Sequence, residues 1–393
     1  MGPQPAASPV FNRTVLLCVG ITWLVHIVTY LLNTQLPLQI VALGGSHGQI
    51  GWLFAVNTGI AMVLRPQVGG WVDRYGARKL MLAGAGVLLL TMALLNVAAT
   101  PFMLIALMAG LGIGLALLST AGSIVVADES PADRRGEALS LYYVAASVGV
   151  ATGPPAGFAL AAVGGIALDF IVVTLLSVMI VGLAMALRTP PGCPTLPGGF
   201  GRPWSRYAVP ASIALIITTV GHTAVYAFLP MHAAAAGLGN AAWFFPLMSG
   251  CTIASRLFLR RASDQFGRVR VLVPAMAALA AGTALLALPP TIMSLVLAAV
   301  LLGSGNSMLY PTLVALVVDR APLSERGLAI GTVSGAWDLG VFIGSPMIAS
   351  MVEARGYSAG FLASALAIVL GLGAFLVTER GQRRRPMEAV VVD

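Results

Sequence analysis

Apolar blocks of about the length that crosses a bilayer recur along this chain, and they restrict its fold more than any other feature. A transmembrane helix needs about 20 mostly apolar residues to cross about 30 Å of hydrocarbon. Charged residues make up 9% of the sequence, whereas a soluble domain carries about 25%. Ten-residue segments of alternating polarity, which would indicate a transmembrane β-barrel, are not visible. The sequence therefore excludes a soluble globular protein and predicts an all-α membrane protein.

Twelve blocks have this character, and we expect each to be a transmembrane helix. The first is too long for a cleavable signal peptide and no small-x-small cleavage site follows it, so we interpret it as a retained helix. The approximate ranges are 14–36, 49–70, 80–98, 102–126, 137–162, 169–187, 207–231, 241–259, 271–288, 292–318, 327–352 and 358–378.

The net charge of +8 is distributed very unevenly. When the segments between helices are assigned alternately to the two sides of the membrane, every Lys and Arg except Arg355 falls on one side. The positive-inside rule makes that side cytoplasmic and places both termini there. The charge thus reflects topology, and we expect no nucleic-acid partner. Cys18, Cys193 and Cys251 lie at unrelated positions and indicate neither a disulfide framework nor a metal site.

The sequence repeats itself at a fixed offset of 191 residues, loops included. Such an offset corresponds to six helices plus a linker, which predicts two parallel six-helix bundles around a site at mid-membrane depth. The matched pairs include Arg65 and Arg256, Asp73 and Asp264, Gly76 and Gly267, Asp128 and Asp319, Arg135 and Arg326, Gly149 and Gly340, Gly153 and Gly344, and Pro155 and Pro346.

The repeat also divides the chain into regions. We expect an N-terminal bundle over 1–187 and a C-terminal bundle over 207–378. Residues 188–206 are rich in Pro and Gly and read as a cytoplasmic linker between bundles that move relative to each other. Residues 379–393 read as a short basic cytoplasmic tail near anionic lipid.

The loop after the second block reads Gly69-Gly-Trp-Val-Asp73-Arg74-Tyr-Gly76-Ala-Arg78-Lys79. This pattern resembles the cytoplasmic loop motif of the major facilitator superfamily, and together with the repeat and the basic linker the resemblance covers essentially the whole chain. It implies the major facilitator fold, alternating access to a small-molecule substrate, a monomer without cofactors, and a place in the bacterial inner membrane.

The resemblance further implies a conformational latch at the cytoplasmic face. In the family the loop Asp docks on the eleventh helix and holds the outward-facing state, where a helix N-terminus stabilises an anion. A plain positive-inside loop is the alternative. The expected latch residues are Gly69, Asp73, Arg74, Gly76, Arg78, Asp128, Arg135, Asp264 and Arg326.

The fifth block carries a second motif, made of Gly149, Gly153, Pro154 and Gly157. It resembles the fifth-helix motif of exporters that work as antiporters, although small residues four apart also serve ordinary close packing. Many proton-coupled relatives have an Arg in the fourth helix and a carboxylate in the first. Neither is present in this sequence, so those coupling groups do not carry over.

Asp338 is the carboxylate that lies deepest within a predicted helix. It comes twelve residues after Arg326, which is about 18 Å along a helix and near mid-depth. An ionisable residue there costs roughly 2.5–3.5 kcal/mol on insertion scales, so its presence suggests a function. We expect Asp338 to exchange protons. A structural carboxylic acid, hydrogen-bonded between helices, is the alternative.

Two His-x3-Tyr pairs occupy the first and seventh blocks, and the spacing puts each pair on one helical face. The resemblance places helices 1, 4, 7 and 10 around the cavity, so we expect the pairs to meet across it. The histidines titrate near neutral pH and are candidates for proton coupling with Asp338, or else packing residues. His47 and His232 read as solvated loop residues. The expected cavity residues are His26, Tyr30, Asn33, Tyr142, His222, Tyr226, Asn306, Tyr310 and Trp337. The fifth block also offers Tyr143, the neighbour of Tyr142.

Such a cavity suits a neutral, zwitterionic or amphiphilic organic solute. The leading hypothesis is a proton-coupled exporter. One alternative is an importer, by symport or uniport, of a sugar, organic acid or metal chelate. Another is a membrane-embedded enzyme or receptor, but no set of converging acid, base and nucleophile is visible in the sequence.

Overall fold

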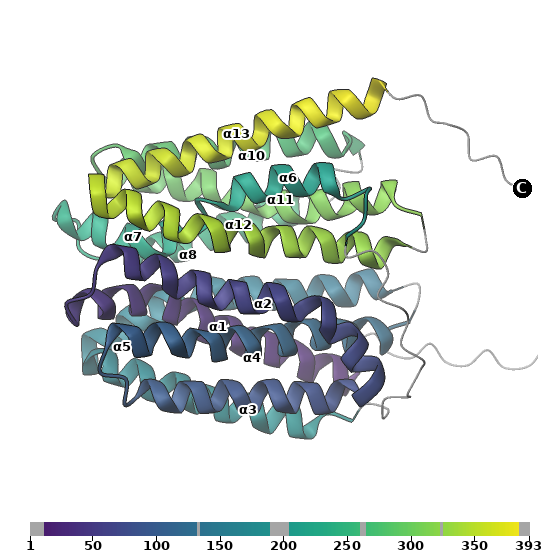
Figure 1. The fold of residues 1–393 in the computed structure, drawn as a ribbon, viewed down its shortest axis with the longest axis horizontal. Helices are drawn as coiled ribbons and strands as arrows, with labels where there is room; N and C mark the ends of the chain where they lie inside the picture. Colours follow the sequence, from purple (N-terminus) through teal and green to yellow (C-terminus); the bar gives the residue numbers. More distant parts are fainter. Residues whose placement is uncertain (1–11, 132–133, 189–203, 260–264, 323–324, 385–393) are drawn as a thin grey trace, which may run out of the picture.

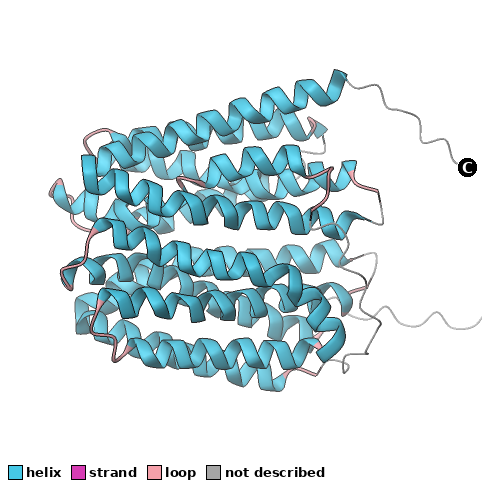
Figure 2. Ribbon diagram, in the orientation of Figure 1, coloured by secondary structure: helices cyan, strands magenta, loops and turns pink. Residues whose placement is uncertain are grey.

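A computed structural model describes residues 12–131, 134–188, 204–259, 265–322 and 325–384, and within these ranges every regular element is a helix. Figure 2 shows these helices joined by short connections. Their bounds are α1 (Arg13–Ala42), α2 (His47–Tyr75), α3 (Ala77–Leu95), α4 (Pro101–Asp128), α5 (Arg135–Ala186), α6 (Val209–Thr219), α7 (His222–Ala235), α8 (Phe244–Phe258), α10 (Arg268–Ala287), α11 (Ile292–Arg320), α12 (Arg326–Arg355) and α13 (Tyr357–Arg384).

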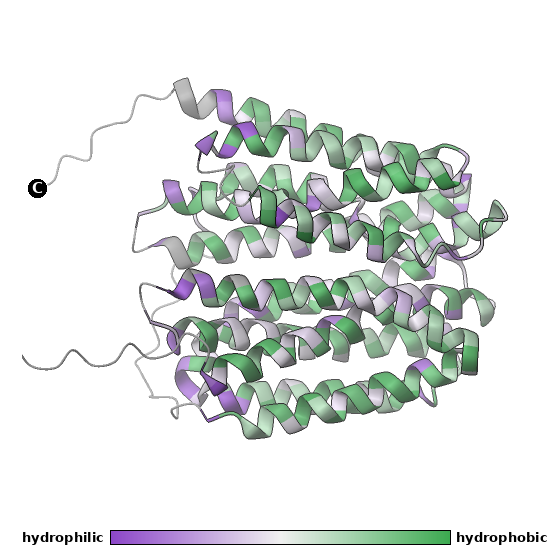
Figure 3. Ribbon diagram, turned by 180° about the vertical axis from the view of Figure 1, so that it is seen from behind, coloured by the Kyte–Doolittle hydropathy of each residue, from purple (hydrophilic) through white to green (hydrophobic). Residues whose placement is uncertain are grey.

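The helices form two bundles with nearly parallel axes. Figure 1 shows α1 to α5 in the lower bundle and α6 to α13 in the upper one, with the two bundles side by side. Hydrophobic residues run along the helices, and hydrophilic ones gather mainly at the helix ends (Figure 3). The all-α membrane fold with two bundles is thus as predicted.

Nine helices among the described residues are long and apolar enough to cross a membrane. One of them contains two predicted helices, because Gly165 interrupts α5 with φ 67° and ψ −175°. A left-handed φ is strained for residues other than glycine, which explains a glycine at this turn. Neither α2 nor α8 meets the same criteria. The count of twelve membrane-crossing helices therefore stays a prediction.

Two segments differ from their predicted bounds. The expected helix 207–231 is two helices, α6 and α7, separated at Val220 and Gly221. At the other end of the chain, α13 continues through the expected start of the tail to Arg384. There Glu379 is buried and accepts a 2.7 Å bond from Arg320, and this ion pair explains why the helix continues.

The two ends of the molecule differ in how closely the bundles meet. We call the end with the loops after α2, α4 and α11 the basic end, and the other the far end. At the far half of α2, a Cβ on Gly51 would lie 2.6 Å from Pro346 of α12. At the basic half, Cβ atoms on Gly69 of α2 or on Gly331 and Gly335 of α12 would have no described atom within 4 Å. The two helices therefore diverge toward the basic end.

Polar contacts hold the bundles together at the far end. The N–H of Gly48, in the first turn of α2, donates to Glu353 of α12 at 2.7 Å, and the Ser46 hydroxyl lies 3.4 Å from the same oxygen. Such a carboxylate is stabilised by the N-terminal end of the α2 dipole. The next residue, His47, lies 3.1 Å through Nε2 from the hydroxyl of Tyr357.

The prediction that His47 and His232 are solvated loop residues is wrong. His47 contacts Tyr357 between the bundles, and His232 is 7% exposed in α7 with its ring 5.6 Å from that of Tyr357. Helices α2 and α7 both extend further toward the far end than the apolar blocks suggested, so their terminal residues are packed rather than solvated.

Candidate transport site

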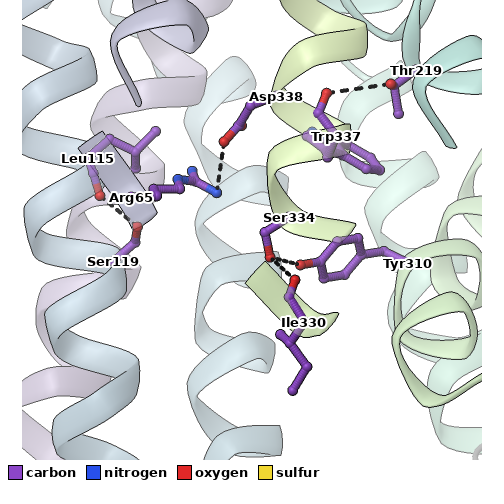
Figure 4. Close-up of polar contacts among 9 residues, drawn as sticks. All are labelled: Arg65, Leu115, Ser119, Thr219, Tyr310, Ile330, Ser334, Trp337 and Asp338. Carbon is purple, nitrogen blue, oxygen red and sulfur yellow. Dashed lines mark hydrogen bonds and ion pairs between the residues drawn. The ribbon is translucent and has the colours of Figure 1, made fainter. Parts of the chain in front are cut away.

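An ion pair joins the two bundles near mid-depth. Arg65 Nη1 of α2 lies 3.3 Å from Asp338 Oδ2 of α12, and the side chains are 29% and 5% exposed. Figure 4 shows Arg65 extending from the N-terminal bundle toward Asp338. The contact lacks hydrogen-bond geometry, so Oδ2 has no hydrogen-bond partner among the described residues. Charge pairs that are largely buried are stable only when well bonded, and this pair is held by its charges without a hydrogen bond to Oδ2.

The repeat matches Arg65 with a second arginine, Arg256. This arginine faces the residue that the repeat matches with Asp338. Arg256 of α8 donates through Nη1 to the Ser147 hydroxyl of α5 at 2.9 Å. Arg65 and Arg256 are 191 residues apart, and so are Ser147 and Asp338. The two contacts are thus copies of one arrangement, one with a carboxylate and one with a hydroxyl.

Aromatic rings form a continuous path from one bundle to the other. The ring of Tyr30 in α1 lies 5.0 Å from that of Tyr226 in α7, edge to face. On either side, His26 stacks on Tyr30 at 6.4 Å and His222 lies 5.4 Å from Tyr226. The two predicted His–Tyr faces do meet, which favours a shared central region.

The path continues along α12 and α11. Trp337 lies 4.8 Å from His222 and 5.8 Å from Tyr310, measured between ring centroids. The Tyr310 hydroxyl is 2.7 Å from that of Ser334. Figure 4 shows Trp337 and Asp338, adjacent on α12, facing Tyr310 and Arg65 respectively. One turn of α12 therefore contributes to both the aromatic path and the ion pair.

A small cavity of about 40 Å³ opens beside this path, within the C-terminal bundle. It is lined by four of the predicted residues, His222, Tyr226, Asn306 and Trp337. A cavity of that size holds a few waters, whereas an organic ligand needs several hundred Å³. Asn33 is partly buried on α1 and does not line it. Substrate must therefore bind in the space between the bundles or in another conformation.

Tyr142 differs from its expected place in the cavity. It is 3% exposed, and its hydroxyl donates to the Ser119 carbonyl of α4 at 3.0 Å, so it packs inside the N-terminal bundle. Its neighbour Tyr143 is 50% exposed and lies close enough to interact electrostatically with Arg65 and Tyr310. The residue that faces the second bundle is thus Tyr143, because adjacent helix positions point about 100° apart.

The glycines of the fifth-helix motif hold α5 against α1. A Cβ on Gly149 would lie 2.7 Å from that of His26, and one on Gly153 would lie 2.9 Å from the Ile27 carbonyl. Gly157 is equally close to Gln35. In the C-terminal bundle, Gly340 and Gly344 of α12 lie against Thr219 and Val220. Close packing within each bundle accounts for these glycines, and their directional meaning stays a prediction.

The latch residues are separated in this structure. Asp73, Asp128 and Arg135 are exposed, and Arg78 donates to the Met185 carbonyl at 3.1 Å. Arg74 lies over the Tyr75 ring. Gly69 has open space beside it and Gly76 begins α3 with φ 86°. Asp264 and the linker residues 189–203 lie outside the described residues, and the side chain of Arg326 is not described. The latch stays a prediction.

Sequence reasoning missed Arg65 and Arg256 as site residues. Both count among the charges of the cytoplasmic side, although they lie within predicted helices and the repeat matches them. That combination was the available signal, since a charge kept at the same depth in two transmembrane helices is costly without a function. What the sequence did not contain was the partner of either arginine.

Comparison with known proteins agrees with this architecture. The family model of the Major Facilitator Superfamily matches residues 18–258 and 211–390, and the chain belongs to this family of transporters. It is therefore a multi-pass membrane transporter and not an enzyme.

Individual relatives are distant. The staphylopine export protein of Staphylococcus aureus is 22% identical over 88% of this chain and 91% of its own. An uncharacterized MFS-type transporter of Pseudomonas aeruginosa is 27% identical, and the match covers 44% of each chain, which is less than half the length of that relative. Among solved structures, a POT family transporter in complex with a thioalcohol-conjugated peptide has a TM-score of 0.80 at 12% identity and covers 95% of this chain and 96% of that one.

Proposed function

We propose that this protein is a secondary active exporter that exchanges protons for a small organic or amphiphilic solute. The single observation that carries the proposal is the ion pair between Arg65 and Asp338, which joins the two bundles near mid-depth. A monomer in the bacterial inner membrane is sufficient for this activity, since the pair and the aromatic path lie within one chain.

The pair provides a coupling device because it connects protonation to bundle movement. Separating the bundles at α2 and α12 would remove the cation from a carboxylate that is 5% exposed in the paired state. Burying an unpaired charge is so unfavourable that the group takes up a proton instead. Movement that breaks the pair and protonation of Asp338 would therefore favour each other, as an antiporter requires.

The divergence of α2 and α12 supports an inward-open conformation. The positive-inside rule predicts that the basic end is cytoplasmic, and the contacts of Glu353 and Tyr357 close the far end. The exposed Asp73 agrees with this state, because its latch belongs to the outward-facing one. The two His–Tyr faces, on α1 and α7, would line the path of the substrate between the two sides of the membrane.

Export rather than import is favoured by two observations. The fifth-helix motif resembles that of antiporters, and one full-length relative bears the name of an export protein. Import by proton symport is the competing direction, and it would use the same ion pair with the opposite order of steps.

Inside-out membrane vesicles test the proposal with a mixture of solutes in place of one chosen substrate. Vesicles with and without the protein are incubated in cell extract with an acidic lumen, and solutes in the lumen are identified by mass spectrometry. We expect at least one organic solute to accumulate, and a protonophore to abolish the accumulation. Solutes lost from preloaded vesicles under the same gradient would instead establish import. Accumulation that persists without the gradient would rule out proton coupling.

A further inference from the structure

Arg256 combines a permanent charge with incomplete bonding. A guanidinium remains protonated in proteins and offers five N–H donors. The contact that the structure gives it is the Ser147 hydroxyl, and its Nε is buried without a hydrogen-bond partner among the described residues. The residue as a whole is partly buried, and a charge in such a place is stabilised by an anion that pairs with it.

The repeat indicates what is missing. Arg65 occupies the matching position in the first half, and there the facing residue is Asp338. Opposite Arg256 that position is Ser147. The carboxylate that would complete the symmetry is absent from the described chain, so the Arg256 guanidinium has a hydroxyl where its counterpart has an anion.

The surroundings suit the acid group of an organic molecule. Tyr143 lies one turn before Ser147 on α5 and is half exposed, and Tyr310 is close enough to Tyr143 to interact with it. Both supply ring faces, whereas the Tyr310 hydroxyl already bonds to that of Ser334. A guanidinium that has no anion among the described residues offers one net charge and forked donors, which match a carboxylate better than a doubly charged phosphate.

We propose that Arg256, beside Ser147, binds the carboxylate of an organic anion, which is the substrate class of this transporter. The Ser147 hydroxyl donates to the Tyr143 carbonyl and accepts from Arg256, so the guanidinium supplies the donors for the acid. The inference rests on the proposed transport function and narrows its substrate from organic solutes in general. The substrate acid takes the place that Asp338 holds in the other half, between the two bundles, where its apolar part contacts Tyr143 and Tyr310.

Binding to the purified full-length protein tests this inference directly. The probes are hippurate, hexanoate and N-acetylphenylalanine, each compared with its primary amide at constant ionic strength, and the readout is the shift in unfolding temperature. We expect at least one acid to stabilise the wild type and its amide to have no effect. Stabilisation by no acid, or by acid and amide equally, would overturn the assignment.

Four variants locate the site. Arg256→Gln should weaken binding of the acid about tenfold or more, the effect of losing one charge-assisted interaction, whereas Arg270→Gln, at an exposed arginine of α10, should leave it unchanged. If Arg256→Gln does not fold, Ser147→Asp answers the same question with both arginines present. It supplies the carboxylate missing from the repeat, and should block acid binding about tenfold more than the neutral Ser147→Asn.

Each outcome separates this inference from the proposed transport function. Equal acid binding by Ser147→Asp and Ser147→Asn would disprove the carboxylate site, whatever the vesicles show. Acid binding that follows these expectations, in a protein that transports nothing against a proton gradient, would retain the site and disprove the coupling.

Discussion

Arg65 and Asp338 form an ion pair near mid-depth, but their contact lacks the geometry of a hydrogen bond. The carboxylate oxygen at 3.3 Å from Arg65 has no hydrogen-bond partner in the described chain. A stronger pair would hold the bundles in one conformation, because separating well-bonded buried charges costs several kcal/mol. The loose geometry is what a transporter needs, since its two states must differ by little.

Replacing Asp338 by Asn should separate coupling from binding. We expect gradient-driven accumulation to fall about tenfold or more, because the amide cannot exchange a proton. Exchange of labelled for unlabelled substrate should continue, since it needs no net proton movement. The matched control is Glu137→Gln, an exposed carboxylate paired with Arg134. Unchanged gradient-driven accumulation in the Asn variant would remove Asp338 from the coupling mechanism.

Removing Arg65 alone should destabilise the protein more than removing the whole pair. Arg65→Gln leaves a buried carboxylate without its cation, and we expect a loss of about 1–2 kcal/mol because Arg65 is partly exposed. The double variant Arg65→Gln with Asp338→Asn should recover most of that loss. Unfolding temperatures of the four proteins give the interaction energy, and strictly additive effects would show that the pair has no energetic coupling.

Small residues bring neighbouring helices close together within each bundle. Gly149 and Gly153 of α5 bring His26 and Tyr30 of α1 to their place in the aromatic path, as Gly340 and Gly344 of α12 do for α6. Small residues let helix backbones approach in lipid, where the hydrophobic effect does not drive helices together.

A methyl group on Gly153 should force α1 and α5 apart. Its Cβ would lie 2.9 Å from the Ile27 carbonyl and from the Leu31 nitrogen, which are both backbone atoms that cannot rotate away. We expect Gly153→Ala to lower stability by about 1–3 kcal/mol and to weaken substrate binding. Gly86→Ala is the matched control, since its Cβ has open space on α3. Equal unfolding temperatures for the two variants would contradict the close-packing role.

At the scale of the whole molecule, contacts between the bundles at the far end stabilise the inward-open state relative to the outward-open one. Glu353 of α12 bonds to the first turn of α2, and the aromatic rings of His47 and Tyr357 pack beside it. Apart from the Arg65–Asp338 pair, no counterpart is described between the same helices toward the basic end, where glycines face open space. The conformation therefore depends on whether α2 and α12 contact each other at the far end or at the basic end.

Substituting Gln for Glu353 should shift this balance toward the outward-open state. The amide keeps the shape but loses the charge that the α2 N-terminus stabilises. We expect labelling of Tyr143→Cys by an impermeant maleimide from the basic end to become a few times slower. Glu325→Gln, whose carboxylate lies near Ser205 within the C-terminal bundle, provides the comparison. Faster labelling in the Glu353 variant would show that this contact opposes the inward-open state.

The sequence alone determined the class of fold, the two-bundle repeat and the family. Apolar blocks of bilayer length are set by neighbouring residues, and the offset of 191 residues is visible by comparing the two halves of the sequence. Both can therefore be recognised without coordinates. The same local reasoning placed Asp338 at mid-depth and His26 and His222 on faces that meet. It could not decide between Tyr142 and Tyr143, because that choice depends on the rotation of α5 against α4.

Only the tertiary structure decided which groups face each other. Arg65 lies 273 positions before Asp338 in the sequence, and no pattern within either helix connects them. The packing of α2 against α12 creates that pair, and the packing of α5 against α8 leaves Arg256 facing Ser147 instead of an acid. Side-chain partners across two bundles depend on helix rotation and spacing in three dimensions, and those are properties of the assembled fold.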